Sequence, residues 1–206
     1  ADRSTRTGRN PVVLVVPPES RGMYEVEVKV RADHDAVRAR LDELDAEPLG
    51  TVEQVDTYFD APHRDFAETD EALRLREERD ADGAVTELTY KGPLVEEASK
   101  TREEIESKVA DRERVQAIFE SLGFSPAATV EKERTRYRIE EFTVTLDTVS
   151  EVGEFVEVET ECEHEEDVPS ERRAAEDLLE SLDLDPEDGI RTSYLGMLLA
   201  DDDASE

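Results

Sequence analysis

Alternation between charged and apolar residues is the feature that most restricts how this chain can fold. In the stretch MYEVEVKV (residues 23–30), Glu25, Glu27 and Lys29 alternate with three valines. Successive side chains of a β-strand point to opposite faces, so the pattern predicts a strand with one valine face and one charged face. The valine face is expected to pack on a core. Whether the charged face meets water or lines a site depends on the other strands.

The same alternation returns in six later segments between residues 72 and 161. In each segment the polar side chains share one face and the apolar side chains share the other. The polar rows are Arg74 and Arg76; Thr89 and Lys91; Arg102, Glu104 and Glu106; Lys132, Arg134, Arg136 and Arg138; Thr143, Thr145 and Asp147; and Glu157, Glu159 and Glu161.

Composition indicates that these charged rows face inward. The chain has 56 acidic and 25 basic residues and a formal net charge of −31, so a solvated face should be mostly acidic. Instead several rows are basic, and three of the five lysines lie in them. The predicted helices also need an apolar surface to cover, and the strands offer only their aliphatic faces. A barrel of about eight strands satisfies both conditions, because its interior holds side chains or one small ligand.

We therefore predict an α+β fold: an eight-stranded antiparallel β-barrel or tunnel with helices packed on the outside. Apolar residues at helical spacing predict helices over residues 33–46, 111–124, 170–182 and 191–199. The sequence DADG (80–83) predicts a hairpin turn. Residues 23–200 are expected to form a single domain, preceded by a peripheral or disordered extension (1–22) and followed by an acidic tail (201–206).

The net charge also excludes some partners. Nucleic acid and anionic membrane surfaces would both be repelled by so acidic a chain. No apolar run approaches the roughly 18 residues that a membrane span requires. Cys162 is the only cysteine, so there is no disulfide framework. We expect a cytoplasmic protein of a halophile, because concentrated salt screens charge repulsion within about 3 Å at 1 M.

The predicted interior requires charged ligands. Carboxylates gathered in one cavity raise one another's pKa unless a cation lies between them. Arginine forks suit phosphate oxygens, and glutamate oxygens suit hard divalent cations. A polyphosphate with Mg²⁺ or Mn²⁺ meets both needs. The sequence has no P-loop, so side chains would have to hold the phosphates.

At this point the chain resembles a known family, the CYTH superfamily of triphosphate tunnel metalloenzymes. MYEVEVKV carries the family's ExExK signature, and the resemblance continues in order through DTYFD, LRLRE, TYKGP, TREEIE, EKERTR, TLDTV, FVEVE and SYLGMLL. It covers residues 23 to 199. The family's fold is an eight-stranded antiparallel tunnel with helices outside, as the strand faces predict.

The resemblance implies a role for each matching residue. The implied metal ligands are Glu25, Glu27, Glu157 and Glu159, with Glu104 and Asp147 in support. The implied triphosphate-binding residues are Arg74, Arg76, Lys91, Lys132 and Arg134, with Arg136 on the same face. The catalytic role falls to Lys29, which would orient the reacting phosphate or the attacking oxygen.

The resemblance leaves the reaction open. The DTYFD and SYLGMLL blocks look most like class IV adenylate cyclases, which convert ATP to cyclic AMP and pyrophosphate. The alternative is a triphosphatase acting on tripolyphosphate, thiamine triphosphate or a nucleoside triphosphate. A further alternative is a module that binds nucleotide or polyphosphate without turnover. Tunnel enzymes need no partner for catalysis, so the chain is expected to be a monomer or a homodimer.

Overall fold

The computed structural model describes residues 24–96 and 101–203, and in them eight strands form one antiparallel sheet. The strand order is β1-β8-β7-β6-β2-β3-β4-β5. The bounds are β1 Tyr24–Arg31, β2 Glu47–Asp60, β3 Ala72–Arg79, β4 Ala84–Glu96, β5 Thr101–Val109, β6 Ser125–Ile139, β7 Phe142–Val149 and β8 Gly153–Cys162. The helices are α1 His34–Glu43, α2 Phe66–Thr69, α3 Arg112–Ser121, α4 Val168–Ser181 and α5 Tyr194–Asp203, with single 3-10 turns at Glu165–Asp167 and Pro186–Asp188.

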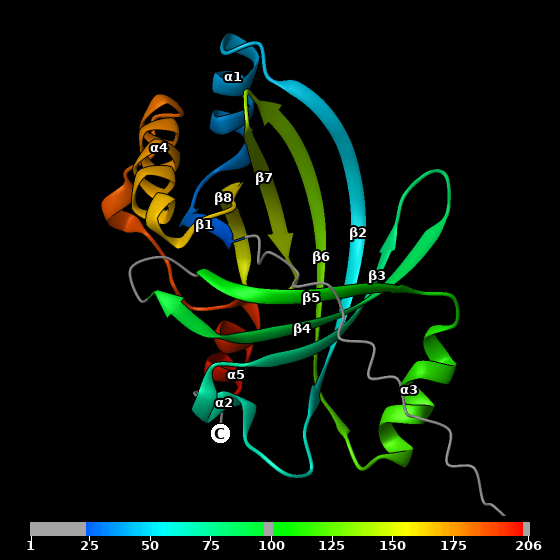
Figure 1. The fold of residues 1–206 in the computed structure, drawn as a ribbon. Coiled ribbons are helices and arrows are strands. Elements are labelled where there is room, and N and C mark those ends of the chain that lie inside the picture. The colour runs from blue at the N-terminus through cyan, green and yellow to red at the C-terminus, as the bar shows by residue number, and fades with distance from the viewer. Residues whose placement is uncertain (1–23, 97–100, 204–206) are drawn as a thin grey trace, which may run out of the picture.

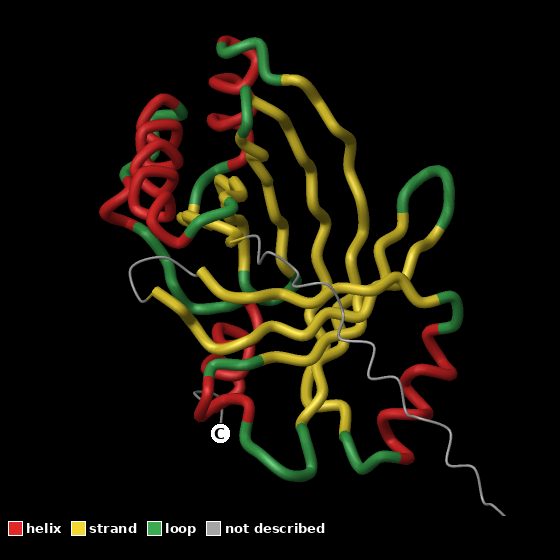
Figure 2. Tube along the Cα trace, viewed as in Figure 1, coloured by secondary structure: helices red, strands yellow, loops and turns green. Residues whose placement is uncertain are grey.

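The sheet curls into a barrel-like half-tunnel. In Figure 1 the strands β1, β8, β7, β6 and β2 stand upright, and β3, β4 and β5 run across them. Figure 2 shows the same two sets of strands in yellow. The long strands β2 and β6 lie where the upright and the crossing strands meet. Their pairing shifts register between Pro48 and Gly50 and between Tyr58 and Phe59. The edge strands β1 and β5 are in contact, although no ladder of hydrogen bonds pairs them among the described residues.

The aliphatic faces of the upright strands pack against two helices. Val30 of β1 and Val158 of β8 share one buried cluster with Leu41 of α1 and with Ala175 and Leu179 of α4. Each of these five side chains is at most 1% exposed. Burying a side chain the size of valine or leucine contributes about 1.5–3 kcal/mol, so this layer forces the charged faces of the same strands inward.

The predicted fold class is confirmed, and the helices differ from the expectation in detail. Helix α1 ends at Glu43 rather than at residue 46, because Asp45 adopts a left-handed backbone conformation (φ 53°). The helix α2 was not predicted. Elsewhere the outer surface is less covered than expected: Val85 of β4 and Ile105 of β5 are 50% and 58% exposed.

Helix α5 takes a different position from α1 and α4. It lies at one end of the barrel, the lower end in Figure 1, where α2 also lies. Its first residue, Tyr194, packs in a cluster with Val130, Val149 and Phe155. This helix therefore closes one end of the sheet's interior instead of covering its outer face.

The expected terminal segments are only partly described. Residues 1–22, expected as an extension, lie outside the described residues. Helix α5 runs to Asp203, so the first three residues of the expected acidic tail are helical. No helix in the described part of the chain has the length and apolar character needed to cross a bilayer.

Candidate functional site

A cavity of about 370 Å³ lies inside the curled sheet, and residues of α2 and α5 line part of it. Seven strands (β1 to β6 and β8), helices α2 and α5 and the loops beside them supply its lining residues. Eleven of the thirteen predicted site residues line the cavity: Glu25, Glu27, Lys29, Arg74, Arg76, Lys91, Glu104, Lys132, Arg134, Glu157 and Glu159. The two that do not are Arg136 and Asp147.

Three carboxylates from neighbouring strands converge on one wall of the cavity. Each of Glu27, Glu157 and Glu159 offers an oxygen within 4.8 Å of the other two. The antiparallel register places Glu27 of β1 directly opposite Glu159 of β8. Burial and the nearby Glu157, Glu25 and Glu27 charges raise the pKa of Glu159 well above its usual range, although Arg134 opposes them. Like charges opposite one another destabilise a sheet, so this cluster favours a bound cation.

Glu25 lies apart from that cluster, at the seam where β1 meets β5. Burial raises its pKa to about 7; Lys91 lowers it, and Glu104 and Glu27 raise it further. The amine of Lys91 on β4 is hydrogen-bonded to the carboxylate of Glu104 on β5. The three side chains therefore join the two edges of the sheet through charge rather than through backbone hydrogen bonds.

Arg134 is held by carboxylates from two strands. Its Nε and Nη2 donate to Asp147 at 2.7 and 2.6 Å, and Nη2 also donates to Glu157 at 2.6 Å. Burial alone would raise the pKa of Asp147, but the charges of Arg134 and Lys132 outweigh it and lower that pKa to about 2. The same arginine and two lysines, Lys29 and Lys132, lower the pKa of Glu157 to about 2 against the effect of burial. Arg134 therefore keeps Asp147 and Glu157 in their ionised forms.

A second ion-pair group on the other side of the cavity contains a residue that was not predicted. Asp56 of β2 is fully buried and accepts two hydrogen bonds of 2.7 Å from Arg76 of β3. Arg74 donates to Thr89 at 3.2 Å, while its Nε is buried without an acceptor among the described residues. A buried donor without an acceptor costs about 1–3 kcal/mol, which a ligand oxygen would offset.

Two lysines meet on the ring of Tyr194. The Nζ of Lys29 lies 4.3 Å from the ring centroid, and the Nζ of Lys132 lies 5.0 Å from it. Lys29 also pairs with Glu27 and with Glu157, both at 3.5 Å. Burial, Arg134 and Arg76 together lower the pKa of Lys132 to about 7. Tyr194 was not among the predicted site residues; it belongs to the SYLGMLL block, whose place at the end of the tunnel only the fold reveals.

Arg136 shares the inner face of β6 with Lys132 and Arg134 but lies beyond the cavity. Its Nη2 donates to Glu78 at 2.7 Å, and its side chain is one third exposed. Glu78 in turn accepts a hydrogen bond from Gln54 at 2.6 Å. The pair of Arg136 and Glu78 therefore lies on the inner face of the sheet, just beyond the residues that line the cavity.

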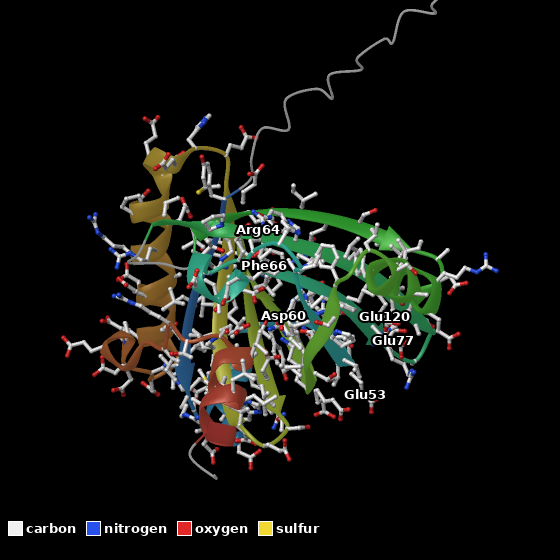
Figure 3. The ribbon with its side chains drawn as sticks, turned by 90° about the horizontal axis from the view of Figure 1, so that it is seen from below. Glu53, Asp60, Arg64, Phe66, Glu77 and Glu120 are labelled. Atoms are coloured by element: carbon white, nitrogen blue, oxygen red, sulfur yellow. The ribbon has the colours of Figure 1, made fainter. Side chains whose placement is uncertain are left out.

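The end of the cavity between α2 and α5 has an apolar rim. Phe66 and Ala67 of α2 line it from one side, and Leu195 and Leu199 of α5 line it from the other. Figure 3, seen from below, shows Phe66 beside Arg64 near this end of the barrel. The Arg64 guanidinium lies 5.2 Å from the Phe66 ring centroid. The cavity is therefore strongly charged along its strands and apolar at one end.

This arrangement defines a class of protein: a β-tunnel whose charged interior gathers acidic and basic side chains around a single cavity. Residues 23–194 match the family model of the CYTH domain. The chain therefore belongs to the CYTH family, as its sequence motifs indicate.

Individual relatives agree with this assignment. The chain is 38% identical over 177 residues to "Putative adenylate cyclase MJ0240" of Methanocaldococcus jannaschii, covering 84% of this chain and 97% of that protein. It is 26% identical over 166 residues to "Adenylate cyclase CyaB" of Aeromonas hydrophila, covering 80% and 83%. The solved structure of the PH1819 protein from Pyrococcus horikoshii is 37% identical, with a TM-score of 0.82 over 86% of this chain and 99% of that one.

Proposed function

We propose that this chain is a metal-dependent enzyme that converts ATP to cyclic AMP and pyrophosphate inside its β-tunnel. The observation that carries the proposal is the set of side chains that line this cavity. A carboxylate cluster, a set of arginines and lysines and an apolar rim all face the same space. The names of the M. jannaschii and A. hydrophila relatives support the choice of reaction.

The carboxylate cluster fits a divalent cation. Glu27, Glu157 and Glu159 are hard oxygen donors, and burial together with the neighbouring carboxylates raises the pKa of Glu159 against the effect of Arg134. Mg²⁺ and Mn²⁺ are bound by one or two carboxylates together with substrate phosphates. When bound there, the ion would neutralise phosphate charge and polarise a phosphorus–oxygen bond.

The cationic residues would hold the triphosphate. Arg74, Arg76 and Lys91 face the carboxylate wall from β3 and β4, and Lys132 lies on β6. Arg74 retains a buried donor for a phosphate oxygen. Arg134 already forms ion pairs with three carboxylates, so its main effect would be to orient the acidic wall. Lys29, between that wall and Tyr194, would orient the reacting phosphate or the attacking oxygen.

In the proposed reaction the ribose 3′-oxygen attacks the α-phosphorus. A new O3′–P bond forms, the bond from the α-phosphorus to the α–β bridging oxygen breaks, pyrophosphate leaves with that oxygen, and the 3′-hydroxyl proton is released. Hydrolysis by a triphosphatase would use the same groups, with water attacking the terminal phosphorus. The apolar rim favours a nucleotide over inorganic triphosphate, because only the nucleotide has a base and ribose to place against Phe66, Leu195 and Leu199.

Product analysis tests the reaction. The protein is incubated with ATP and Mn²⁺ in concentrated KCl, and the products are separated by chromatography. We expect cyclic AMP and pyrophosphate. ADP and phosphate, or rapid turnover of tripolyphosphate, would replace the cyclase with a triphosphatase, and binding without products would leave a nucleotide-binding module.

A substitution in the apolar rim tests whether the rim contacts the nucleoside. Leu199 is 46% exposed, and Leu199→Ser removes about one buried aliphatic contact, so the KM for ATP should rise by roughly 5- to 10-fold. Binding of tripolyphosphate should not change. Leu122→Ser, at the residue directly after α3, serves as the control, because this leucine is 64% exposed and does not line the cavity. Equal effects of Leu199→Ser on both ligands would show that the rim does not contact the nucleoside.

A further inference from the structure

The segment that links α4 to α5 brings an additional arginine to the cavity. In Figure 1 this segment runs from α4 past β1 to the lower end of the barrel. The backbone N–H of Ile190 donates to the carbonyl oxygen of Lys29 at 2.7 Å. Because this bond holds Ile190 against the backbone of Lys29, the next residue, Arg191, is held near the lysine at the centre of the site. Arg191 and Ser193 both line the cavity.

Arg191 has an unusual electrostatic position for this chain. Other arginines near the cavity are paired with carboxylates, as Arg76 is with Asp56 and Arg102 with Asp70. Within residues 24–96 and 101–203, no hydrogen bond or ion pair engages the Arg191 side chain. It is exposed at the open side of the cavity. With 56 acidic and 25 basic residues, a cation that faces the cavity and has no carboxylate partner is available to an anionic ligand.

The neighbouring residues add to the same positive region. Helix α5 begins at Tyr194, and Ser193 Oγ accepts a hydrogen bond from the N–H of Gly196 at 3.0 Å. Ser193, Tyr194, Leu195 and Gly196 all line the cavity, so the positive end of the helix dipole lies at its wall. The same short segment thus presents a guanidinium and a helix N-terminus beside the apolar rim formed by α5.

We propose that Arg191 is a substrate-binding residue that contacts a phosphate oxygen of the triphosphate at the open side of the cavity. The C-terminal segment then recognises both ends of the nucleotide, through Arg191 on the phosphates and through Leu195 and Leu199 on the nucleoside. This inference rests on the proposed function for the identity of the ligand. Two observations do not depend on the reaction: the hydrogen bond from Ile190 to Lys29, and a guanidinium that has no partner among the described residues.

The test compares Arg191→Gln with Arg173→Gln at one fixed KCl concentration. Arg173 lies on α4, is exposed, does not line the cavity and has no ion pair with any described residue, so both variants change the net charge equally. For Arg191→Gln we expect the Kd of inorganic tripolyphosphate, measured by calorimetry with Mg²⁺, to rise about 10-fold. The KM for ATP should rise by a similar factor with little change in kcat. Arg191→Lys should restore only part of the loss, because an ammonium lacks the planar fork of guanidinium.

The outcomes separate this inference from the proposed function. If the wild-type protein binds tripolyphosphate but forms no product from ATP, the enzymatic proposal fails and the Kd ratio still decides the role of Arg191. If Arg191→Gln and Arg173→Gln match the wild type in both Kd and KM, Arg191 is an ordinary solvated arginine and the inference is overturned. A decrease in kcat without a change in Kd or KM would also overturn it, since the loss of a binding contact must weaken binding.

Discussion

Two glutamates on one strand, one buried and one partly buried, show how local partners decide the ionisation state of a carboxylate. Glu157 and Glu159 are two positions apart on β8 and face the same cavity. Glu157 has Arg134 and Lys29 beside it, and its pKa is lowered to about 2. Glu159 has weaker cationic contacts and more acidic neighbours, and its pKa is raised. We therefore expect Glu159 to respond most strongly to metal.

Replacing Glu159 should weaken metal binding without weakening the fold. Glu159→Gln replaces one of three converging carboxylates with a neutral amide, so the half-saturating Mn²⁺ concentration should rise by at least about 10- to 100-fold. The free energy of unfolding without metal should not fall, because a raised pKa means that the ionised form is the costly one in the folded state. Metal titration of activity and urea unfolding measure the two quantities.

Glu161→Gln is the matched control for that variant. Glu161 lies on the same strand, is exposed and does not line the cavity. An unchanged Mn²⁺ requirement in Glu159→Gln would remove Glu159 from the metal site. A Glu161→Gln variant with the same defect would mean that net charge, and not position, controls metal binding.

At the scale of the elements, an ion pair between Asp56 and Arg76 joins strands β2 and β3 and stabilises their pairing. Asp56→Asn should destabilise the protein by about 3–5 kcal/mol at pH 7, because it leaves the largely buried Arg76 side chain without its partner. Burial raises the pKa of Asp56, but Arg76 and Arg74 outweigh it and hold the pKa far below its usual range. A lowered folded-state pKa gives stability that is present above the unfolded pKa of about 3.9 and is lost as the pH falls.

The destabilisation by Asp56→Asn should therefore shrink by roughly 1 kcal/mol between pH 7 and pH 3. Urea unfolding of both proteins at several pH values measures the difference. Glu53→Gln, a change at the solvent-exposed end of the same paired region, is the control. A difference that is constant with pH would show that the Asp56 carboxylate is not stabilised by its arginines.

Sequence alternation was enough to predict which faces of the strands point inward, because period 2 fixes the face of every residue once one face is assigned. It therefore located Lys29, Arg74 and Glu159 on the inside of the sheet. It did not predict that Asp56 pairs with Arg76, because that contact depends on the register between β2 and β3. Register is a property of two strands and of the turn between them, and neither strand's sequence states it.

The parts of the site outside the strands were harder to predict for a different reason. Helix α2 has only four residues, too few to show helical periodicity in the sequence. The helical pattern of residues 191–199 was recognised, but amphipathic spacing does not say whether a helix covers a sheet or closes its end. The roles of Tyr194 and Arg191 follow from that placement, so they could be identified only from the fold.

At the scale of the whole molecule, charge is divided between inside and outside. The cavity wall holds alternating acidic and basic groups, whereas acidic residues dominate the chain as a whole. Figure 3 shows Glu53, Glu77 and Glu120 gathered on one side of the molecule, around α3. A net charge of −31 on a chain of 206 residues opposes the compact state unless the repulsion is screened.

Stability should therefore depend on salt. We expect the Tm to rise by about 10 °C between 0.1 and 2 M KCl, equivalent to roughly 3 kcal/mol for a chain of this size. Thermal unfolding followed by circular dichroism measures the change. Sucrose at matched osmolality separates screening from solute exclusion, because it stabilises without screening charge. A Tm that does not change with KCl would contradict the expectation of a protein adapted to concentrated salt.

The pairing of β1 with β8 has a consequence for how the protein is made. These strands lie at opposite ends of the domain sequence, yet Glu27 and Glu159 face each other across their ladder. During synthesis β1 leaves the ribosome long before β8 has been made. Until then the edge of β1 that pairs with β8 has no strand to pair with. Charged side chains on a waiting strand discourage pairing with other chains. The residues proposed to serve catalysis in the finished enzyme would thus first protect the nascent one from aggregation.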